Sequence, residues 1–250
     1  SNAIGILNIL VAVKNYNRKI KVFNATSGQF FGNNKNNFYN EKSVIAPQSP
    51  YGVAKASGYM FTKIFRESYN LYSCSGILFN HESPLRSNEF VTKKIINTSI
   101  KMKKNKKLNL YLGNIDIYRD WGWAPEYVKA MWLMLQQKKP DDYVIATGKQ
   151  YSIKQFINLV AKKLKMKVIW KGKGRNEKGY NDHGYPIIEC DKNYFRPLDV
   201  NTLLGDPSKA ELKLGWSPKI SLEEMVSEMV DYDLETAKQE KIIIERKESE

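Results

Sequence analysis

Short apolar segments alternate with longer helical segments along most of this chain, and that alternation restricts its fold more than any other feature. The apolar runs at residues 19–25, 73–79 and 143–146 have the length and composition of buried strands. The intervening segments 50–69 and 125–137 have the spacing of helices with an apolar face. Strands that alternate with helices favour a parallel sheet, because a parallel crossover needs a dozen or more residues. The sequence therefore predicts an α/β fold.

Two of the predicted helices are unusually apolar. Residues 4–15 are apolar almost all round, which is typical of a helix buried against a sheet or a partner helix. The helix over residues 50–69 has an aromatic-rich stripe for which core packing is the first explanation. That stripe consists of Tyr59, Phe61, Ile64 and Phe65.

Three further helices carry recognisable end signals. Ser152 and Ser221 each stand three residues before a Gln or Glu, the spacing of a capping box. A short helix is expected to begin at Pro207 and to stop before Gly215, because proline favours the first position of a helix and glycine its end. No internal repeat is visible.

The charge and cysteine content exclude several classes of protein. Lys and Arg number 40 against 26 Asp and Glu, a net charge of +14, which raises nucleic acid as a partner. The densest basic run, residues 101–107, has no interleaved aromatic residue, so we interpret it as a solvated helix end and expect no nucleic-acid partner. Cys74 and Cys190 stand alone, which excludes a zinc framework, predicts no metal site and favours a reducing, cytoplasmic compartment. The apolar opening, residues 4–13, is too short to cross a membrane.

The clearest chemical pattern follows the first predicted strand. Thr26 and Ser27 end that strand, and the helix that begins at Pro50 carries Tyr51 and Lys55. Residues one helical turn apart share a face, so the ammonium group of Lys55 can lie beside the phenol of Tyr51. A nearby cation favours phenolate and lowers the pKa of a tyrosine toward the range of a general acid or base. Ser27 can supply a hydroxyl to the same substrate oxygen.

Longer motifs around this pattern resemble the extended short-chain dehydrogenase/reductases, and within them the GDP-mannose 4,6-dehydratase family. The resemblance covers nearly the whole chain after Ala3. It rests on ordered clusters that include SPYGVAK (49–55), GILFNHESPLRS (76–87), LYLGNIDIYRDWG (110–122), YVIATGKQYSIKQF (143–156), YFRPLDVNTLLGD (194–206) and LGWSPKISLEEMVSEMV (214–230). Ordered clusters of this length are far more specific than a Tyr/Lys pair alone.

The resemblance implies NADP as cofactor, GDP-mannose as substrate, and a reaction that oxidises the hexose at C4, removes water across C5 and C6 and returns the hydride to C6. It implies that Tyr51 takes the proton of the C4 hydroxyl, while Lys55 lowers the pKa of Tyr51 and holds the nicotinamide ribose. Ser27 would hydrogen-bond the C4 oxygen, where the family usually has threonine. His81 and Arg86 fall on cofactor contacts of the family. Its nucleotide-sugar contacts fall on or close to Asn80, Thr92, Lys93, Arg119, Arg196 and Asp199.

One position departs from the family's catalytic pattern. Two residues beyond the Ser/Thr the dehydratases have glutamate, and this chain has Gln29. The C5 proton must be removed before water is lost, and a carboxamide has no proton-accepting state near neutral pH. Loss of a general base costs about 10² to 10⁴ in rate. A chain with Gln29 at this position is therefore expected to keep oxidation at C4 and to lose the elimination of water.

The resemblance also predicts a domain organisation. A dinucleotide-binding domain usually starts with a strand, a Gly-rich turn and a helix, and the 250 residues contain no G-x-G-x-x-G sequence. We therefore expect a partial Rossmann-like parallel sheet without its N-terminal strands, followed by a smaller C-terminal α/β substrate domain. The expected parts are a tag remnant (1–3), the Rossmann-like domain (4–80 with 115–148), the nucleotide-sugar domain (81–114 with 149–240) and a charged tail (241–250).

Three functional hypotheses follow from the sequence. The first is a GDP-mannose 4,6-dehydratase-like protein that is inactive as an isolated chain, because the cofactor turn is absent and Gln29 replaces the base. The second is a GDP-sugar ketoreductase or epimerase of the same superfamily, which needs Tyr, Lys and Ser but no Glu. The third is a non-catalytic nucleotide-sugar-binding protein. We also expect a homo-oligomer, because the strand at residues 21–25 would have an edge open to another chain.

Overall fold

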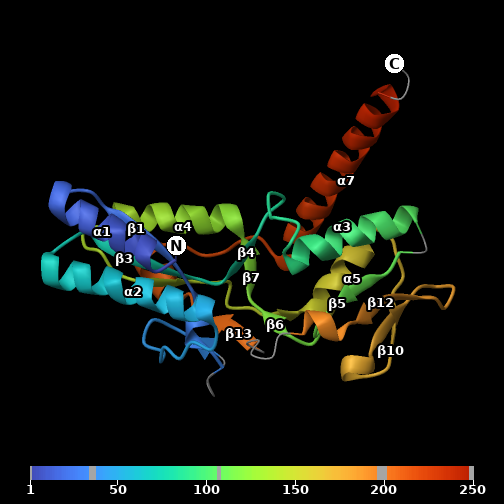
Figure 1. The fold of residues 1–250 in the computed structure, drawn as a ribbon, viewed down its shortest axis with the longest axis horizontal. Helices are drawn as coiled ribbons and strands as arrows, with labels where there is room; N and C mark the ends of the chain where they lie inside the picture. Colours follow the sequence, from blue (N-terminus) through green and yellow to red (C-terminus); the bar gives the residue numbers. More distant parts are fainter. Residues whose placement is uncertain (1, 34–37, 106–107, 196–201, 248–250) are drawn as a thin grey trace. The chain divides into compact units, whose positions relative to one another are not determined.

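The computed structural model of the protein describes residues 2–33, 38–105, 108–195 and 202–247 (Figure 1). The chain forms two compact units, each built from three separate segments. Unit 1 consists of Ser1–His81, Tyr118–Tyr151 and Leu198–Lys219, and unit 2 of Glu82–Ile117, Ser152–Pro197 and Ile220–Glu250.

A parallel three-stranded sheet forms the centre of unit 1. Its strands are β1 (Val22–Ser27), β3 (Ser73–Leu78) and β8 (Tyr143–Ile145), in the order β1-β3-β8. The register places Val22 opposite Ser73 and Ser27 opposite Leu78. Every residue of β3 is buried, as expected for the middle strand of a parallel sheet covered on both faces. The predicted α/β fold with a parallel Rossmann-like sheet is confirmed.

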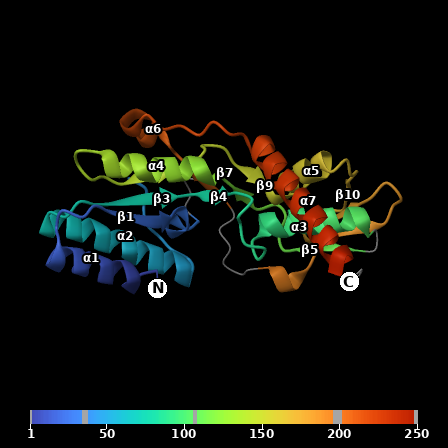
Figure 2. The ribbon, with the colours of Figure 1, turned by 90° about the horizontal axis from the view of Figure 1, so that it is seen from above.

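Three helices cover this sheet. Helices α1 (Ile4–Tyr16) and α2 (Pro50–Tyr69) lie on one face, and α4 (Ala124–Gln136) lies on the other (Figure 2). Helix α2 starts where the sequence predicts, because the Ser49 hydroxyl accepts a hydrogen bond from the Gly52 amide at 3.0 Å and Pro50 takes the first helical position. It ends at Asn70, whose φ of 55° is left-handed.

Helices α1 and α2 bury one side each rather than their whole apolar surface. In α1, Leu10 and Val13 are buried while Ile9 is 53% exposed. In α2, Phe65 is buried and the neighbouring Ile64 is 50% exposed. Successive helical residues point about 100° apart, so only one of two adjacent side chains can face the sheet or the other helix. Core packing of the aromatic-rich stripe is therefore correct for Phe65 and wrong for Ile64.

A second set of short strands also belongs to unit 1. Strand β13 (Thr202–Gly205) pairs in parallel with β2 (Phe38–Tyr39) and with β6 (Tyr118–Arg119). Strands β4 (Asn80–Glu82) and β7 (Trp121–Trp123) form a separate two-stranded sheet. The pairing of β13 explains why residues 202–219 cluster with unit 1, whereas the sequence grouped them with the nucleotide-sugar domain.

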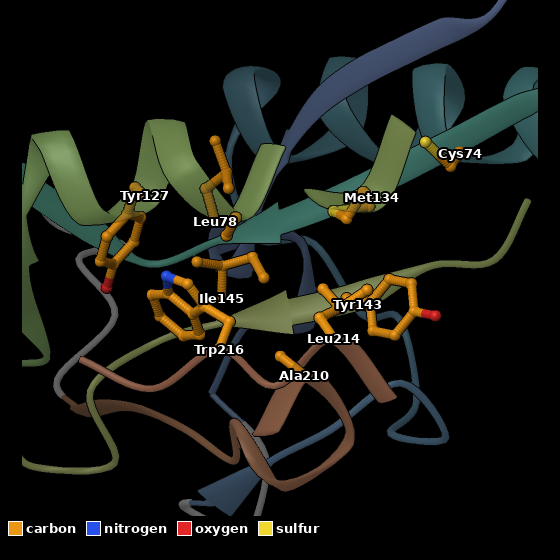
Figure 3. Packing of buried hydrophobic residues seen from close by; sticks show 10 residues of the cluster. Cys74, Leu78, Tyr127, Met134, Tyr143, Ile145, Ala210, Leu214 and Trp216 are labelled. Carbon is orange, nitrogen blue, oxygen red and sulfur yellow. The ribbon is translucent and has the colours of Figure 1, made fainter. Parts of the chain in front are cut away.

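The segment after β13 completes a core of unit 1. Helix α6 (Ser208–Leu214) ends at Gly215, whose φ is +62°, as the sequence predicts. Figure 3 shows Ala210, Leu214 and Trp216 from this segment beside residues of β3, α4 and β8. The Trp216 indole N–H donates to the Glu126 carbonyl at 2.8 Å, which satisfies its polar atom inside the apolar cluster.

Unit 2 combines a four-stranded sheet with three helices. The strands β10 (Ile169–Lys171), β11 (Lys178–Tyr180), β12 (Pro186–Cys190) and β5 (Leu110–Leu112) lie in that order, antiparallel except for the parallel pair β12 and β5. Helices α3 (Val91–Lys104), α5 (Ile153–Lys163) and α7 (Leu222–Lys247) pack against one another. Strand β9 (Tyr151–Ser152) precedes α5. The short helices η2 (Gly174–Asn176) and η3 (Lys192–Tyr194) lie in unit 2, and η1 (Gly28–Phe31) lies in unit 1.

Both predicted capping boxes are present in unit 2. The Ser152 hydroxyl accepts from the Gln155 amide at 3.1 Å, and the Gln155 side chain accepts from the Ser152 amide at 2.7 Å. Ser221 and Glu224 make the same reciprocal pair at the start of α7. Each box satisfies amides that the first turn of a helix leaves without partners.

Candidate functional site

The carboxyl end of β1 turns directly into η1. The Ser27 hydroxyl accepts a hydrogen bond from the Gln29 amide at 3.3 Å, which starts this short helix and leaves the hydroxyl proton of Ser27 able to serve a ligand. Gly28 fits because a Cβ there would come within 2.8 Å of the Phe79 ring. This close approach fixes the chain at the point where it carries Ser27 and Gln29.

The first turns of α2 pack against that same turn. A Cβ on Gly52 would lie 3.1 Å from the Gln29 carbonyl oxygen, so helix and turn are in direct contact. The Lys55 ammonium donates to the Ala25 carbonyl at 2.9 Å and lies 5.6 Å from the centre of the Tyr51 ring. Burial lowers the pKa of Lys55. The structure thus gathers the end of β1, Gln29 and the predicted Tyr51 and Lys55 pair.

Tyr51 remains accessible in this arrangement. Its side chain is 46% exposed, whereas the carbonyl partner of Lys55 belongs to the backbone of β1. Lys55 has three N–H donors and gives one to Ala25, so two remain for ribose or substrate oxygens. The predicted acid/base pair is therefore positioned by backbone contacts and open to a ligand.

His81 lies in unit 1 near the end of β4. Its Nδ1 is 2.9 Å from the Phe79 carbonyl oxygen, which can only accept, so the proton of a neutral imidazole is on Nδ1 and Nε2 is an acceptor. The imidazole stacks on Tyr127 with ring centres 5.0 Å apart, and Tyr127 meets the edge of Trp216 at 5.9 Å. His81 is thus held as an oriented hydrogen-bond acceptor. Asn80, the predicted substrate contact beside it, is partly buried.

Sequence reasoning selected Arg119 and missed its neighbour Asp120. The Arg119 guanidinium donates to the Tyr118 carbonyl at 2.8 Å and is 8% exposed. Asp120 is fully buried, and its carboxylate accepts from the Thr147 amide and hydroxyl at 2.8 and 2.6 Å, from Gly148 at 3.1 Å and from Gly205 at 3.3 Å. Burial raises the pKa of Asp120 to about 6, although the hydrogen bonds that its carboxylate accepts act in the opposite direction and lower it.

One pattern in the sequence could have pointed to Asp120: an acidic residue stands between Arg119 and the large apolar residue Trp121. A carboxylate in such a place needs several donors, because burial of an unpaired charge is costly. The donors come from segments 27 and 85 residues away. Only the folded structure shows that Asp120 ties the carboxyl ends of β8 and β13 to Arg119.

Two predicted substrate contacts in unit 2 have their side chains inside the unit. Thr92 is fully buried, and its hydroxyl donates to the Glu82 carboxylate at 2.9 Å. Lys93 is 5% exposed and donates to the Pro84 carbonyl at 2.7 Å and to Asp233 at 2.5 Å. In this arrangement the functional groups of both residues are already engaged by protein.

The next residue, Lys94, was missed by sequence reasoning and lies nearer the surface. Its ammonium donates to the Tyr111 carbonyl at 2.7 Å and sits 3.6 Å above the ring centre of Tyr194. The two tyrosines are 44% and 52% exposed. The ammonium group of Lys94 therefore lies among partly exposed aromatic rings, whereas that of Lys93 is buried.

The remaining predicted residues divide into two groups. Arg86, in unit 2, forms an ion pair with Glu82 at 3.2 Å. Arg196 and Asp199 lie outside the described residues. Within residues 2–33, 38–105, 108–195 and 202–247, no group of three or more His, Cys, Asp or Glu side chains could hold a metal ion. In the same part of the chain no helix has the length and apolarity needed to span a membrane.

Comparison with known proteins places this chain in a family. The sequence model described as GDP-mannose 4,6 dehydratase matches residues 1–229. The chain belongs to the GDP-mannose 4,6-dehydratase family. It is 42% identical to GDP-mannose 4,6 dehydratase 2 of Caenorhabditis elegans over 235 residues, which cover 93% of this chain and 62% of that protein. It is 44% identical to a GDP-mannose 4,6-dehydratase of Vibrio cholerae over 249 residues, 94% of this chain and 67% of the relative.

Solved structures agree with the fold. UDP-glucose 4-epimerase from Thermotoga maritima, solved with UDP-glucose, matches with a TM-score of 0.78 and 25% identity over 94% of this chain and 70% of its own. RMD from Pseudomonas aeruginosa, complexed with NADPH, matches with a TM-score of 0.76 and 19% identity over 92% and 72%. Against curated relatives such as the nematode protein, the chain spans less than two thirds of their length.

Proposed function

We propose that this protein binds a GDP-sugar, with GDP-mannose as the reference ligand, and acts on C4 of the hexose through Ser27, Tyr51 and Lys55. The single observation that carries the proposal is the contact between the first turn of α2 and η1, which gathers these residues with Gln29 in a member of the GDP-mannose 4,6-dehydratase family. In this proposal Tyr51 accepts the proton of the C4 hydroxyl, Lys55 favours its phenolate, and Ser27 hydrogen-bonds the C4 oxygen.

We propose NADP as the cofactor, held by Tyr51, Lys55, His81 and Arg86. The donor set fits a dinucleotide, because Lys55 retains two N–H donors for ribose hydroxyls and Arg86 carries a guanidinium suited to phosphate. When bound, NADP supplies the hydride acceptor for C4. We propose Asn80, Arg119, Arg196 and Asp199 as nucleotide-sugar contacts. The two other predicted contacts, Thr92 and Lys93, are buried and bonded to carboxylates, and we propose that they support this site from inside unit 2.

Gln29 decides between two candidate reactions. Gln29 places a carboxamide where the dehydratases have their general base. Oxidation and reduction at C4 do not use that base, whereas removal of the C5 proton requires it. A GDP-sugar C4 ketoreductase or epimerase is therefore the second candidate, and Gln29 is the observation that favours it. A non-catalytic nucleotide-sugar-binding protein is the outcome if binding occurs without turnover.

The test compares the unsubstituted protein with Gln29→Glu. Each is supplied with GDP-mannose and NADP, and the 4-keto-6-deoxy product is measured by mass spectrometry. Neither form is expected to make product as an isolated chain. When the missing dinucleotide-binding half is supplied in trans, Gln29→Glu is expected to raise elimination by about 10² to 10⁴, and Gln48→Glu, at an exposed glutamine of the same unit, is the matched control. Dehydration by the unsubstituted protein at a rate that Gln29→Glu does not increase would show that another group is the base.

Ligand preference gives an independent test. The sequence contains no G-x-G-x-x-G motif, whose turn would bind a pyrophosphate, while the predicted nucleotide-sugar contacts are present. GDP and GDP-mannose are therefore expected to bind more tightly than NADP. Isothermal titration calorimetry measures all three ligands. Micromolar binding of NADP together with no response to GDP would contradict the proposal.

We further propose that the protein forms a homo-oligomer through α1 and α2. The support is the apolar surface that both helices leave exposed, including Ile9 at 53% and Ile64 at 50%. Light scattering at tens of micromolar protein is expected to give a particle mass larger than that of one chain. Ile64→Glu is expected to lower the measured mass toward that of the monomer. A monomer for the unsubstituted chain would refute this assembly.

A further inference from the structure

Glu82 is a buried carboxylate that the proposed chemistry does not use. It is 2% exposed, and its Oε2 atom receives two contacts within unit 2: the Thr92 hydroxyl donates at 2.9 Å, and the Arg86 Nε lies 3.2 Å away. Burial raises the pKa of Glu82 to about 7, while Arg86 and Thr92 lower it. A carboxylate enclosed in this way cannot reach a substrate proton, so its part in the site must be exerted through its two partners.

Arg86 is held on two sides. Its Nε edge faces the Glu82 carboxylate, and its guanidinium plane lies over the Phe90 ring, with Cζ 3.4 Å from the ring centre. The turn that carries it is fixed as well, because the Arg86 amide donates to the Ser83 carbonyl at 3.0 Å and Lys93 donates to the Pro84 carbonyl at 2.7 Å. The Arg86 side chain is 25% exposed against 2% for Glu82, so it connects the buried pair with the surface.

These contacts leave one edge of the guanidinium for a ligand. The Nε atom lies 3.2 Å from the Glu82 carboxylate in an ion pair that lacks hydrogen-bond geometry, and the other contacts of Arg86 with the described residues are made by the face of its guanidinium on Phe90 and by its backbone amide. Two adjacent N–H groups of an arginine match two oxygens of a phosphate group. A guanidinium whose direction is already set loses less conformational entropy when it binds such a group.

We propose that Glu82 and Thr92 are positioning residues that aim the terminal edge of Arg86 at a phosphate group of a bound nucleotide. Thr92 holds the carboxylate of Glu82, and Glu82 holds Arg86. The ligand class rests on the proposed function, whereas the orientation of Arg86 is a property of this chain alone. Thr92, a predicted substrate contact, then contributes without touching the ligand.

The experiment separates orientation from charge. Thr92→Val removes the hydroxyl without changing any charge or much volume, and Thr92→Ser keeps the hydroxyl. Exchange of the Arg86 Nε proton is measured by ¹⁵N NMR. The Nε proton of Arg66 is the internal reference, because Arg66 belongs to unit 1 and binds Asp142 through its two terminal nitrogens. Thr92→Val is expected to speed exchange at Arg86 and not at Arg66, and Thr92→Ser to keep exchange slow.

Binding is followed through the same Arg86 signal during titration with sodium pyrophosphate and with NADPH. Thr92→Val is expected to weaken both affinities by about threefold to tenfold, the range set by loss of one ordered side chain, and Thr92→Ser by less than about twofold. Glu82→Gln is expected to weaken binding in the unsubstituted background and to change nothing further in Arg86→Ala, because the effect acts through Arg86. Thermal unfolding of each variant shows whether it folds, and Glu82→Gln replaces Thr92→Val if the latter does not.

Three results would overturn the proposal. One is equal proton exchange at Arg86 in Thr92→Val and the unsubstituted chain. Another is a rise in phosphate affinity in Glu82→Gln, which would show that Glu82 acts on Arg86 by charge alone. A third is no response of the Arg86 signal to pyrophosphate at any concentration. If pyrophosphate binds as expected while neither NADPH nor GDP-mannose does, the positioning role stands and the proposed function fails.

Discussion

Tyr51 and Lys55 in unit 1 and Thr92 and Lys93 in unit 2 all lie in the first two turns of a helix, yet their side chains have opposite environments. Tyr51 is 46% exposed, and a bond to the backbone carbonyl of Ala25 anchors Lys55. Thr92 and Lys93 are buried, and both are bonded to carboxylates. A helical position therefore predicts which residues share a face, but acidic partners elsewhere in the chain decide whether a functional group is free for a ligand.

The largest expected effect concerns Asp120, the buried carboxylate of unit 1. Asp120→Ala would remove the acceptor of three backbone amides, those of the partly buried Thr147 and Gly148 and of the buried Gly205, while the Thr147 hydroxyl would keep the Lys149 carbonyl as its acceptor. At about 1 to 3 kcal/mol for each unsatisfied group, the loss approaches the whole stability of a domain. Urea unfolding is expected to show unit 1 unfolded or destabilised by at least about 3 kcal/mol. Asp206→Ala, at a more exposed carboxylate, is the control and should cost far less.

The next effect tests the buried pair of unit 2. Lys93→Met leaves Asp233 buried without its cation and is expected to destabilise the fold by about 3 to 5 kcal/mol. The double change Lys93→Met with Asp233→Leu should recover much of that loss, because no unpaired charge remains. Lys162→Met breaks an exposed pair with Glu223 and should cost less than about 1 kcal/mol. Equal losses in the free energy of unfolding for Lys93→Met and Lys162→Met would show that burial does not make the Lys93 ion pair more important for stability than an exposed one.

A smaller effect should appear as a dependence of stability on pH. The pKa of Glu82 is raised from 4.5 to about 7 in the folded chain, so between these values the folded state binds more protons than the unfolded state. Stability should therefore fall as pH rises from about 4.5 to about 7, and level off above that range. Glu82→Gln should reduce this slope, as measured by urea unfolding at a series of pH values. A slope of the opposite sign would show that Glu82 is stabilised as a carboxylate.

The smallest expected effect on stability belongs to the exposed pair. Tyr51→Phe should change the free energy of unfolding by less than about 0.5 kcal/mol, because its hydroxyl is at the surface. The same variant should lose oxidation at C4 if the proposed function is correct. A Tyr51→Phe protein that unfolds more easily by about 2 kcal/mol or more would mean that the phenol supports the fold, and the comparison between the units would fail.

Local patterns in the sequence predicted most of the elements. The start of α2 at Ser49 and Pro50, the two capping boxes and the stop at Gly215 were all readable, because each depends on residues a few positions apart. Ile64 was not predicted correctly. Its exposure depends on where α1 and the sheet lie around α2, and apolar content does not contain that information.

Contacts between distant segments set the limit of prediction for the site. Ser27, Tyr51 and Lys55 were found because a short motif carries them. Asp120 was missed because its donors are 27 and 85 residues away. The burial of Lys93 against Asp233 joins residues 140 positions apart. The assignment of 202–219 to unit 1 likewise depends on β13 pairing with distant strands.

The four bonds to Asp120 also have a mechanical consequence. Thr147 and Gly148 follow β8, and Gly205 ends β13, so a single side chain links the exits of two strands to the backbone that carries Arg119. The motions of these loops are coupled, because all of them are hydrogen-bonded to the same Asp120 carboxylate. Arg119 should therefore move in correlation with both strand ends, and its place should be set by the stiffness of the whole edge of unit 1.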